Sequence, residues 1–187
     1  MSDQTAGQGS LIDELPGELM MWVLIISELL VFGAGLVAFM GVRLTDPVGF
    51  AEAQTHLDRT GAALNTVVLV SSGYLAALGL NWRRQMHRLR ARLALIGAAA
   101  LGVVFLVIKG AEYADKAGQG IGTETHPFFM FYYLLTGFHA AHVLAGVGIL
   151  LLVAWRDNPR NIEAGAQFWH MVDLVWILLF PVIYLLG

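Results

Sequence analysis

Seven ionisable side chains fall inside long apolar segments of this sequence. They are Glu28, Lys109, Glu112, His139, His142, His170 and Asp173. An ionised side chain near the middle of a bilayer costs at least ~2.5 kcal/mol, so such groups usually face protein, water or a partner. Imidazole is a common metal ligand, and buried carboxylates relay protons in pumps and transporters. The residue types therefore suggest a metal or haem site, a proton path, or a buried polar network.

Glu28 is the single carboxylate in an apolar run that extends from Met20 through Val42. Counted from Gly17 at ~1.5 Å per residue, it lies roughly 16 Å along a helix, close to the middle of a ~30 Å hydrocarbon core. A carboxylate at that depth is a candidate functional residue. Taken alone, Glu28 suggests a proton-handling site or a metal ligand.

The spacing of the histidines argues against a haem. His139 and His142 are three residues apart and share one helical face, as do His170 and Asp173. Two histidines on one face would crowd the same side of a haem, and at membrane depth only His170 remains to supply a ligand from another helix. A cytochrome b-like haem anchor is therefore disfavoured. A non-haem metal site that combines Glu28 with these residues stays open, because the sequence spacing of the residues does not fix its geometry.

Lys109 and Glu112 have the same three-residue spacing, so we expect an ion pair between them. A small proton-coupled transporter is a further alternative, because intramembrane carboxylates serve as relays. Transporters commonly show internal repeats and broken central helices. The sequence has no evident repeat, and Pro181 interrupts only the last turns of the final apolar segment.

Five apolar segments must position these groups. They lie near residues 18–43, 61–82, 92–113, 128–155 and 165–186. Each is long enough to cross a bilayer as a helix. The chain is 57% hydrophobic and 13% charged, whereas soluble domains carry about 25% charged residues. The sequence predicts an all-α integral membrane bundle of five transmembrane helices, forming one domain at 18–187 after a polar tail at 1–17.

Net charge and cysteine content argue against nucleic-acid binding and against cofactor sites that need cysteine. The net charge is −3 and no long basic run exists, so nothing indicates nucleic-acid binding. The chain has no Cys, which excludes thiolate metal sites, iron–sulfur clusters and covalent haem attachment through C-x-x-C-H.

Basic residues are concentrated in two of the four connections. The second and fourth connections carry Arg83, Arg84, Arg88, Arg90, Arg92, Arg156 and Arg160. The first and third carry Arg43, Arg59 and Lys116. Because positively charged loops stay in the cytoplasm, the N-terminus is predicted inside and the C-terminus outside. Four tryptophans near segment ends are predicted at the membrane interface, namely Trp22, Trp82, Trp155 and Trp169.

Five stretches of the chain carry distinctive motifs. They are I-I-S-E-L-L-V-F around Glu28, L-N-T-V-V-L-V-S-S-G at 64–73, G-A-E-Y ending at Glu112-Tyr113, and the pair T-G-F-H-A-A-H-V-L-A-G at 136–146 with F-W-H-M-V-D-L-V-W at 168–176. From residue 19 to residue 187 the chain resembles subunit III of the haem–copper cytochrome c oxidase family. The first motif resembles the helix that holds that family's buried glutamate, and the third resembles its Q-x-x-E-Y region.

The resemblance implies a short, five-helix bacterial form of a subunit whose long form has seven helices. It implies a multi-pass protein of the bacterial inner membrane that binds catalytic subunit I and phospholipids. Such a subunit supports stability, sustained turnover and proton uptake, while haem and copper, or non-haem iron, belong to the partner. Glu28 then corresponds to the buried carboxylate. The remaining candidates become a polar network or lipid and subunit contacts: Glu112, Tyr113, His139, His142, His170 and Asp173.

The opening L-P-G-E-L-M-M-W and the short length suggest a narrower resemblance. Both look closer to the subunit-III-like accessory proteins encoded with bacterial nitric oxide reductases, which act in denitrification. Short oxidase subunits III share most of these residues. The predicted partner is therefore either an oxygen-reducing terminal oxidase or a nitric oxide reductase.

Overall fold

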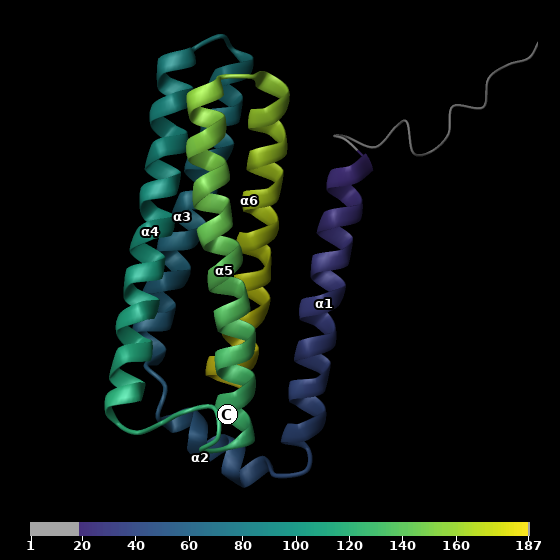
Figure 1. Cartoon of the computed structure of the whole chain (residues 1–187), viewed down its shortest axis with the longest axis vertical. Coiled ribbons are helices and arrows are strands. Elements are labelled where there is room, and N and C mark those ends of the chain that lie inside the picture. Colours follow the sequence, from purple (N-terminus) through teal and green to yellow (C-terminus); the bar gives the residue numbers. More distant parts are fainter. Residues whose placement is uncertain (1–18, 187) are drawn as a thin grey trace, which may run out of the picture.

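The computed structural model describes residues 19–186, and this part of the chain is largely helical (Figure 1). Its elements are α1 (Leu19–Arg43), α2 (Pro47–Thr55), α3 (Arg59–Arg84), α4 (Arg88–Gly118), α5 (Pro127–Arg156), α6 (Pro159–Phe180) and the π-helical η1 (Pro181–Leu185). Five helices are long and apolar enough to span a membrane, α6 continuing into η1. The predicted all-α class with five membrane-spanning helices is confirmed. The tail predicted at 1–17 lies outside the described residues.

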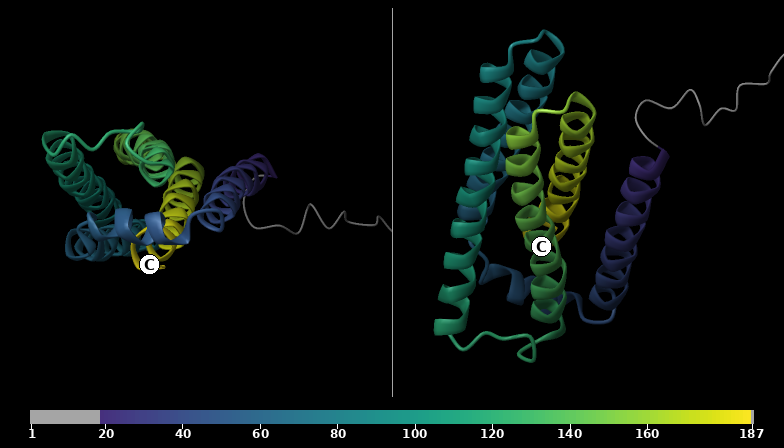
Figure 2. Two further views of the ribbon diagram at one scale, coloured as in Figure 1. Left: turned by 90° about the horizontal axis from the view of Figure 1, so that it is seen from below. Right: turned by 45° about the horizontal axis from the view of Figure 1, so that its top comes forward.

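Helices α3 to α6 pack as a four-helix bundle, and α1 lies beside it. Helix α1 runs next to α5 and α6, on the far side of the bundle from α4 (Figures 1 and 2). Only 11% of the residues in the most apolar stretch of α1 are buried in the protein, compared with 50% of those in the last span. Most of the surface of α1 is therefore available to lipid or to another protein.

The connection between the first two spans contains a short helix that is not among the five predicted segments. Asp46 caps α2 by accepting a hydrogen bond from the Gly49 amide at 3.0 Å, and Pro47 occupies the first helical position. Asp followed by Pro is a helix start signal as well as a stop for the preceding helix. At the other end, Gln54 Nε2 donates to the Ile183 carbonyl at 2.7 Å. Helix α2 is thereby joined to the end of the last span.

We expect α2 to loosen in acid. The hydrogen bond from Gly49, together with the ring of His126 at 3.2 Å, holds the pKa of Asp46 below its usual value of 3.8. A lowered pKa means that the carboxylate stabilises the cap above that usual value and ceases to do so as pH falls through the lowered value. Hydrogen exchange of the α2 amides, corrected for its intrinsic pH dependence, should rise in that acidic window. Asp46→Ala should show the raised exchange already at neutral pH, and wild-type exchange in this variant would contradict the prediction.

Trp169 is fully buried within the bundle, so its predicted interfacial position is wrong. Helix α6 begins at Pro159, which puts Trp169 ~15 Å inside the helix. Its indole Nε1 donates to Ser72 Oγ at 3.0 Å. Gly102 and Gly146 make room for the ring, since a Cβ at either position would lie 2.6 Å from it. Helices α4 and α5 therefore each carry a glycine where the Trp169 indole packs.

Replacing Ser72 with alanine should destabilise the protein by about 1–3 kcal/mol, because the buried indole N–H of Trp169 loses its acceptor. Ser72 Oγ also donates to the Ala98 carbonyl at 2.7 Å, so a link between α3 and α4 is lost as well. Unfolding in mixed micelles measures the change. Ser71→Ala is the matched control because Ser71 is exposed. Equal unfolding free energies for the two variants would rule out this role of Ser72.

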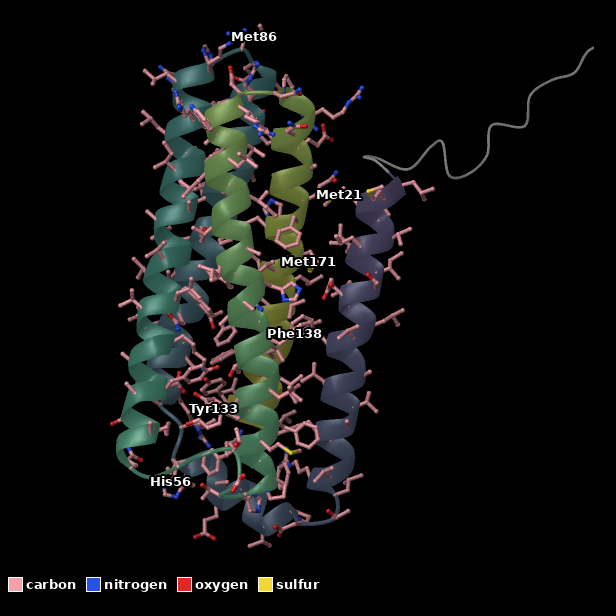
Figure 3. All side chains as sticks on the ribbon, viewed as in Figure 1. Met21, His56, Met86, Tyr133, Phe138 and Met171 are labelled. Atoms are coloured by element: carbon pink, nitrogen blue, oxygen red, sulfur yellow. The ribbon has the colours of Figure 1, made fainter. Side chains whose placement is uncertain are left out.

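The two arginine-rich connections lie at the same end of the molecule. Arg83 pairs with Asp157 at 2.7 Å, and Arg88 approaches the same carboxylate at 3.5 Å, so the α3–α4 and α5–α6 turns are held together. Figure 3 shows Met86 at this end and His56 near the opposite one. Helix α1 begins at the arginine-rich end (Figure 1). The orientation with this end in the cytoplasm stays a prediction.

Candidate functional site

The structure divides the candidate residues into three pairs and one histidine that lies apart from them. The pairs are Glu28 with His142, Lys109 with Glu112, and His170 with Asp173, and the single histidine is His139. The first pair joins α1 to α5, the second lies on α4, and the third lies on α6. Of the residues that share a helical face in the sequence, only His139 and His142 therefore serve different parts of the bundle.

Glu28 and His142 form a contact across the seam between α1 and α5. Glu28 Oε2 lies 3.2 Å from His142 Nε2, which is ion-pair distance without the angular geometry of a hydrogen bond. The other ring nitrogen, Nδ1, lies 2.9 Å from the Phe138 carbonyl oxygen. Phe138 itself projects toward α1 (Figure 3). This contact ties α1 to the bundle through polar side chains at membrane depth.

The contacts of His142 assign the tautomer of its ring. A carbonyl oxygen only accepts, so His142 Nδ1 carries the hydrogen that it donates to Phe138. The other nitrogen, Nε2, faces the Glu28 carboxyl group. An imidazole and a carboxyl group therefore lie side by side inside the membrane span, and both are groups that can carry a proton.

Two apolar cavities lie along α1 on either side of Glu28. One, of about 340 Å³, reaches from Met21 and Leu24 to Phe168. The other, of about 260 Å³, extends from Val31 to Phe138. Their linings are dominated by aliphatic and aromatic side chains, which suit a lipid acyl chain.

Lys109 and Glu112 form the predicted ion pair, with Nζ and Oε2 2.9 Å apart. The ammonium group also donates to the hydroxyls of Tyr132, at 3.2 Å, and of Tyr184. Both hydroxyls in turn donate to Glu112 Oε1, at 2.8 Å and 3.0 Å. All three ammonium hydrogens therefore have acceptors, although Lys109 is only 1% exposed.

Aromatic rings surround the same ammonium group. The Nζ atom of Lys109 lies 4.7 Å from the ring centre of Tyr132 and 5.1 to 5.5 Å from those of Tyr113, Trp176 and Tyr184. Cations are attracted to the faces of such rings, most strongly away from water. Tyr113, a predicted network residue, bonds through its hydroxyl to Thr136 Oγ1 at 2.6 Å. Through these contacts, the Lys109 cluster holds α4, α5 and η1 together.

His139 lies in the aromatic core and is fully buried. Its ring stacks on Trp176 at 5.3 Å and contacts the edge of Phe105 at 5.6 Å. Within residues 19–186, neither ring nitrogen has a hydrogen-bond partner. In that same part of the chain, no three His, Asp or Glu side chains are gathered as ligands for a metal ion.

Sequence reasoning missed Tyr132 and Tyr184 as partners of Glu112. Tyr184 lies 72 positions away from Glu112 in the sequence, so no helical period connects them. The only signal was the buried lysine, whose three hydrogens need more acceptors than one carboxylate supplies.

A family profile and individual relatives identify the same family for this chain. The profile of the family described as cytochrome c oxidase subunit III matches residues 14–187. Cytochrome c oxidase subunit 3 of Corynebacterium diphtheriae is 31% identical, over 87% of this chain and 84% of the relative. The same subunit of Synechocystis sp. is 29% identical, over 87% of this chain and 72% of the relative. A heme-copper oxidase subunit I+III of Aeropyrum pernix is 30% identical, over 88% of this chain and 22% of that protein.

These relatives are oxidase subunits, so they give no support to the nitric oxide reductase and denitrification part of the sequence prediction. Subunits III of haem–copper oxidases associate with subunit I and have no metal centre of their own. Five membrane-spanning helices agree with that class. The chain therefore belongs to the cytochrome c oxidase subunit III family, and it is a multi-pass subunit of a haem–copper oxidase in the bacterial inner membrane.

Proposed function

We propose that this chain binds the catalytic subunit I of a bacterial terminal oxidase and supports its stability and proton uptake. Haem and copper, with the redox chemistry, would belong to that partner. The observation that carries the proposal is the family match over residues 14–187. It is supported by the relative from Aeropyrum pernix, whose name places subunits I and III in one polypeptide.

The Glu28–His142 pair supports the proton-related part of this proposal. Glu28 lies ~14 Å from the start of α1, well inside a spanning helix. Its two side chains lie 3.2 Å apart and are partly exposed at the seam with α1. A partner that covers this seam could exchange a proton with these two groups without a path through the rest of the bundle.

The positions of the polar groups favour a non-catalytic subunit over the two alternatives, a haem-binding anchor and a proton-coupled transporter. His139, His142 and His170 lie in different environments, which disfavours a haem held between two of them. Among residues 19–186, no hydrogen bond joins the Glu28 pair to the Lys109 cluster, whereas a self-contained proton transporter needs a connected series of groups. The apolar cavities beside α1 support the proposed contact with phospholipids.

Purification from native membranes tests the proposal. An affinity-tagged chain should bring down a polypeptide with a haem absorption band, and the isolated chain should lack that band. Oxidase prepared without this chain should lose activity over successive turnovers and take up protons more slowly. Stoichiometric haem on the isolated chain, or undiminished turnover without the chain, would overturn the proposal.

Glu28→Gln tests the role of the Glu28–His142 pair. The amide keeps the shape of the side chain but cannot release a proton in the physiological range. We expect proton uptake by the purified oxidase to slow a few-fold while the subunits still co-purify. Infrared difference spectra provide a second measurement, because the variant should lose a protonated-carboxyl band if the neutral form of the pair is populated. Unchanged proton uptake would limit Glu28 to packing.

A further inference from the structure

His126 accepts hydrogen bonds from the first three amides of α5. Pro127 occupies the first helical position and has no N–H, so the first amide of the helix is that of Phe128. This amide donates to His126 Nδ1 at 3.1 Å. The next two amides, of Phe129 and Met130, donate to the His126 carbonyl oxygen at 2.9 Å and 3.3 Å. The start of α5 therefore depends on one residue, through its backbone and its imidazole ring.

The hydrogen bond from Phe128 assigns the tautomer of this ring. An amide N–H only donates, so His126 Nδ1 accepts and carries no hydrogen. The hydrogen of the neutral imidazole is then on Nε2, which lies 3.2 Å from Asp46 Oδ2 and donates to it. Asp46 in turn caps α2. One imidazole therefore links the first turn of α5 to the first turn of α2.

The ring of His126 is open to water and contacts one charged group. Its side chain is 24% exposed and lies just before the span that begins at Pro127. On the α2 side the ring meets the Asp46 carboxylate and the ring of Phe50, whose centre is 5.3 Å away. Glu124, in the same connection as His126, is exposed. Among the described residues, Asp46 is the ion-pair partner of His126.

A second proton on this ring can bind at one atom only. Because Nε2 already carries a hydrogen, the proton must bind Nδ1, where it displaces the hydrogen bond from the Phe128 amide. The imidazolium also places a positive charge at the positive end of the α5 helix dipole. Its contact with Asp46 is kept, since Nε2–H still donates to the carboxylate. Protonation therefore exchanges the side-chain cap of α5 for an ion pair with the start of α2.

We propose that His126 is a proton-sensitive switch that releases the first turn of α5 when the solution at this end of the molecule becomes mildly acidic. This end is the one opposite the arginine-rich connections (Figure 1), which is the outer side in the predicted orientation. Imidazole is the side chain that ordinarily changes its charge between about pH 5 and pH 8. The capped state binds one proton fewer than the released state, so a fall in pH favours release.

The released turn carries a ring that fastens α1 to the bundle. The ring centre of Phe128 lies 5.8 Å from that of Phe39 on α1 and 5.7 Å from that of Phe50 on α2. All three side chains are buried. Protonation of His126 therefore loosens the attachment of α1, the helix that carries Glu28, at its C-terminal end. The switch does not depend on which catalytic subunit the chain binds.

Amide hydrogen exchange in the purified oxidase tests the switch, read at the Phe128 amide and corrected for the intrinsic pH dependence of exchange. Between about pH 8 and pH 5, exchange in the wild type should rise about fivefold, as expected for loss of an N-cap hydrogen bond. His126→Ala should show raised exchange at both pH values, because it has no side-chain cap. His126→Asn should show slow exchange at both, because asparagine caps helices and its amide does not titrate in this range.

His56→Asn is the matched control. His56 is an exposed histidine at the same end of the molecule, so this variant should keep the wild-type response. The response of α5 is also distinct from the loosening of α2 expected on protonation of Asp46, which needs stronger acid. A wild type without the response, or a His126→Asn variant that keeps it, would refute the switch. Slow exchange in His126→Ala at the higher pH would show that the ring does not cap α5.

Discussion

Replacing Glu112 with alanine is expected to lower the free energy of unfolding by about 3–5 kcal/mol, because it leaves a buried cation without its counter-charge. The ammonium group of Lys109 would keep only neutral hydroxyl acceptors in a site that is closed to water. The hydroxyls of Tyr132 and Tyr184 would lose their common acceptor at the same time. The loss should therefore exceed that of an ordinary hydrogen bond.

Unfolding in mixed micelles, followed by circular dichroism, measures this effect. Glu124→Ala is the matched control, since Glu124 is an exposed carboxylate in the connection that follows α4. A second variant, Lys109→Gln, introduces the glutamine of the family's Q-x-x-E-Y pattern. Its amide can still donate to Glu112 without a buried charge, so it should lose less than half as much stability as Glu112→Ala. A small loss in Glu112→Ala would show that the cluster does not hold the helices together.

Trp169→Ala should cost about 3–5 kcal/mol, because it leaves a cavity where two glycines have no side chains to fill the space. The indole lies against Gly102 and Gly146, so α4 and α5 would both lose packing. Ser72 Oγ would lose its indole donor and keep its bond to the Ala98 carbonyl.

The matched control is Trp155→Ala, because Trp155 is 72% exposed and touches little of the bundle. Substitutions at such surface positions usually change stability by less than about 0.5 kcal/mol. Trp169→Phe should be intermediate, since it keeps most of the apolar volume but removes the N–H. Similar unfolding free energies for Trp169→Ala and Trp155→Ala would contradict the assigned packing role.

The number and type of the spanning helices could be predicted because lipid imposes them on the sequence. A chain in hydrocarbon must pair its backbone groups within itself, so each long apolar segment becomes a helix. The ends of the helices were predicted less well, because they lie in polar segments, where hydropathy gives no signal. The cap formed by Asp46 and Pro47 and the early start of α6 at Pro159 are two such cases.

Local spacing predicted part of the candidate site. The three-residue step correctly paired Lys109 with Glu112. The same step leaves about 60° between side chains, which is enough to send His139 into the aromatic core and His142 to Glu28. Whether two neighbours act together therefore depends on which helix each one meets.

By itself, the sequence determined an all-helical protein with five spans, its family, and the set of polar groups that need partners within the membrane. The tertiary structure decided which partners they have. Glu28 meets His142 across more than a hundred residues, Glu112 meets Tyr184, and Asp173 keeps one buried oxygen without a hydrogen-bond donor among residues 19–186. Helical periodicity reports only contacts within one helix, whereas contacts between helices depend on their packing. Packing alone distinguishes a polar group that finds a partner within the described residues from one that does not.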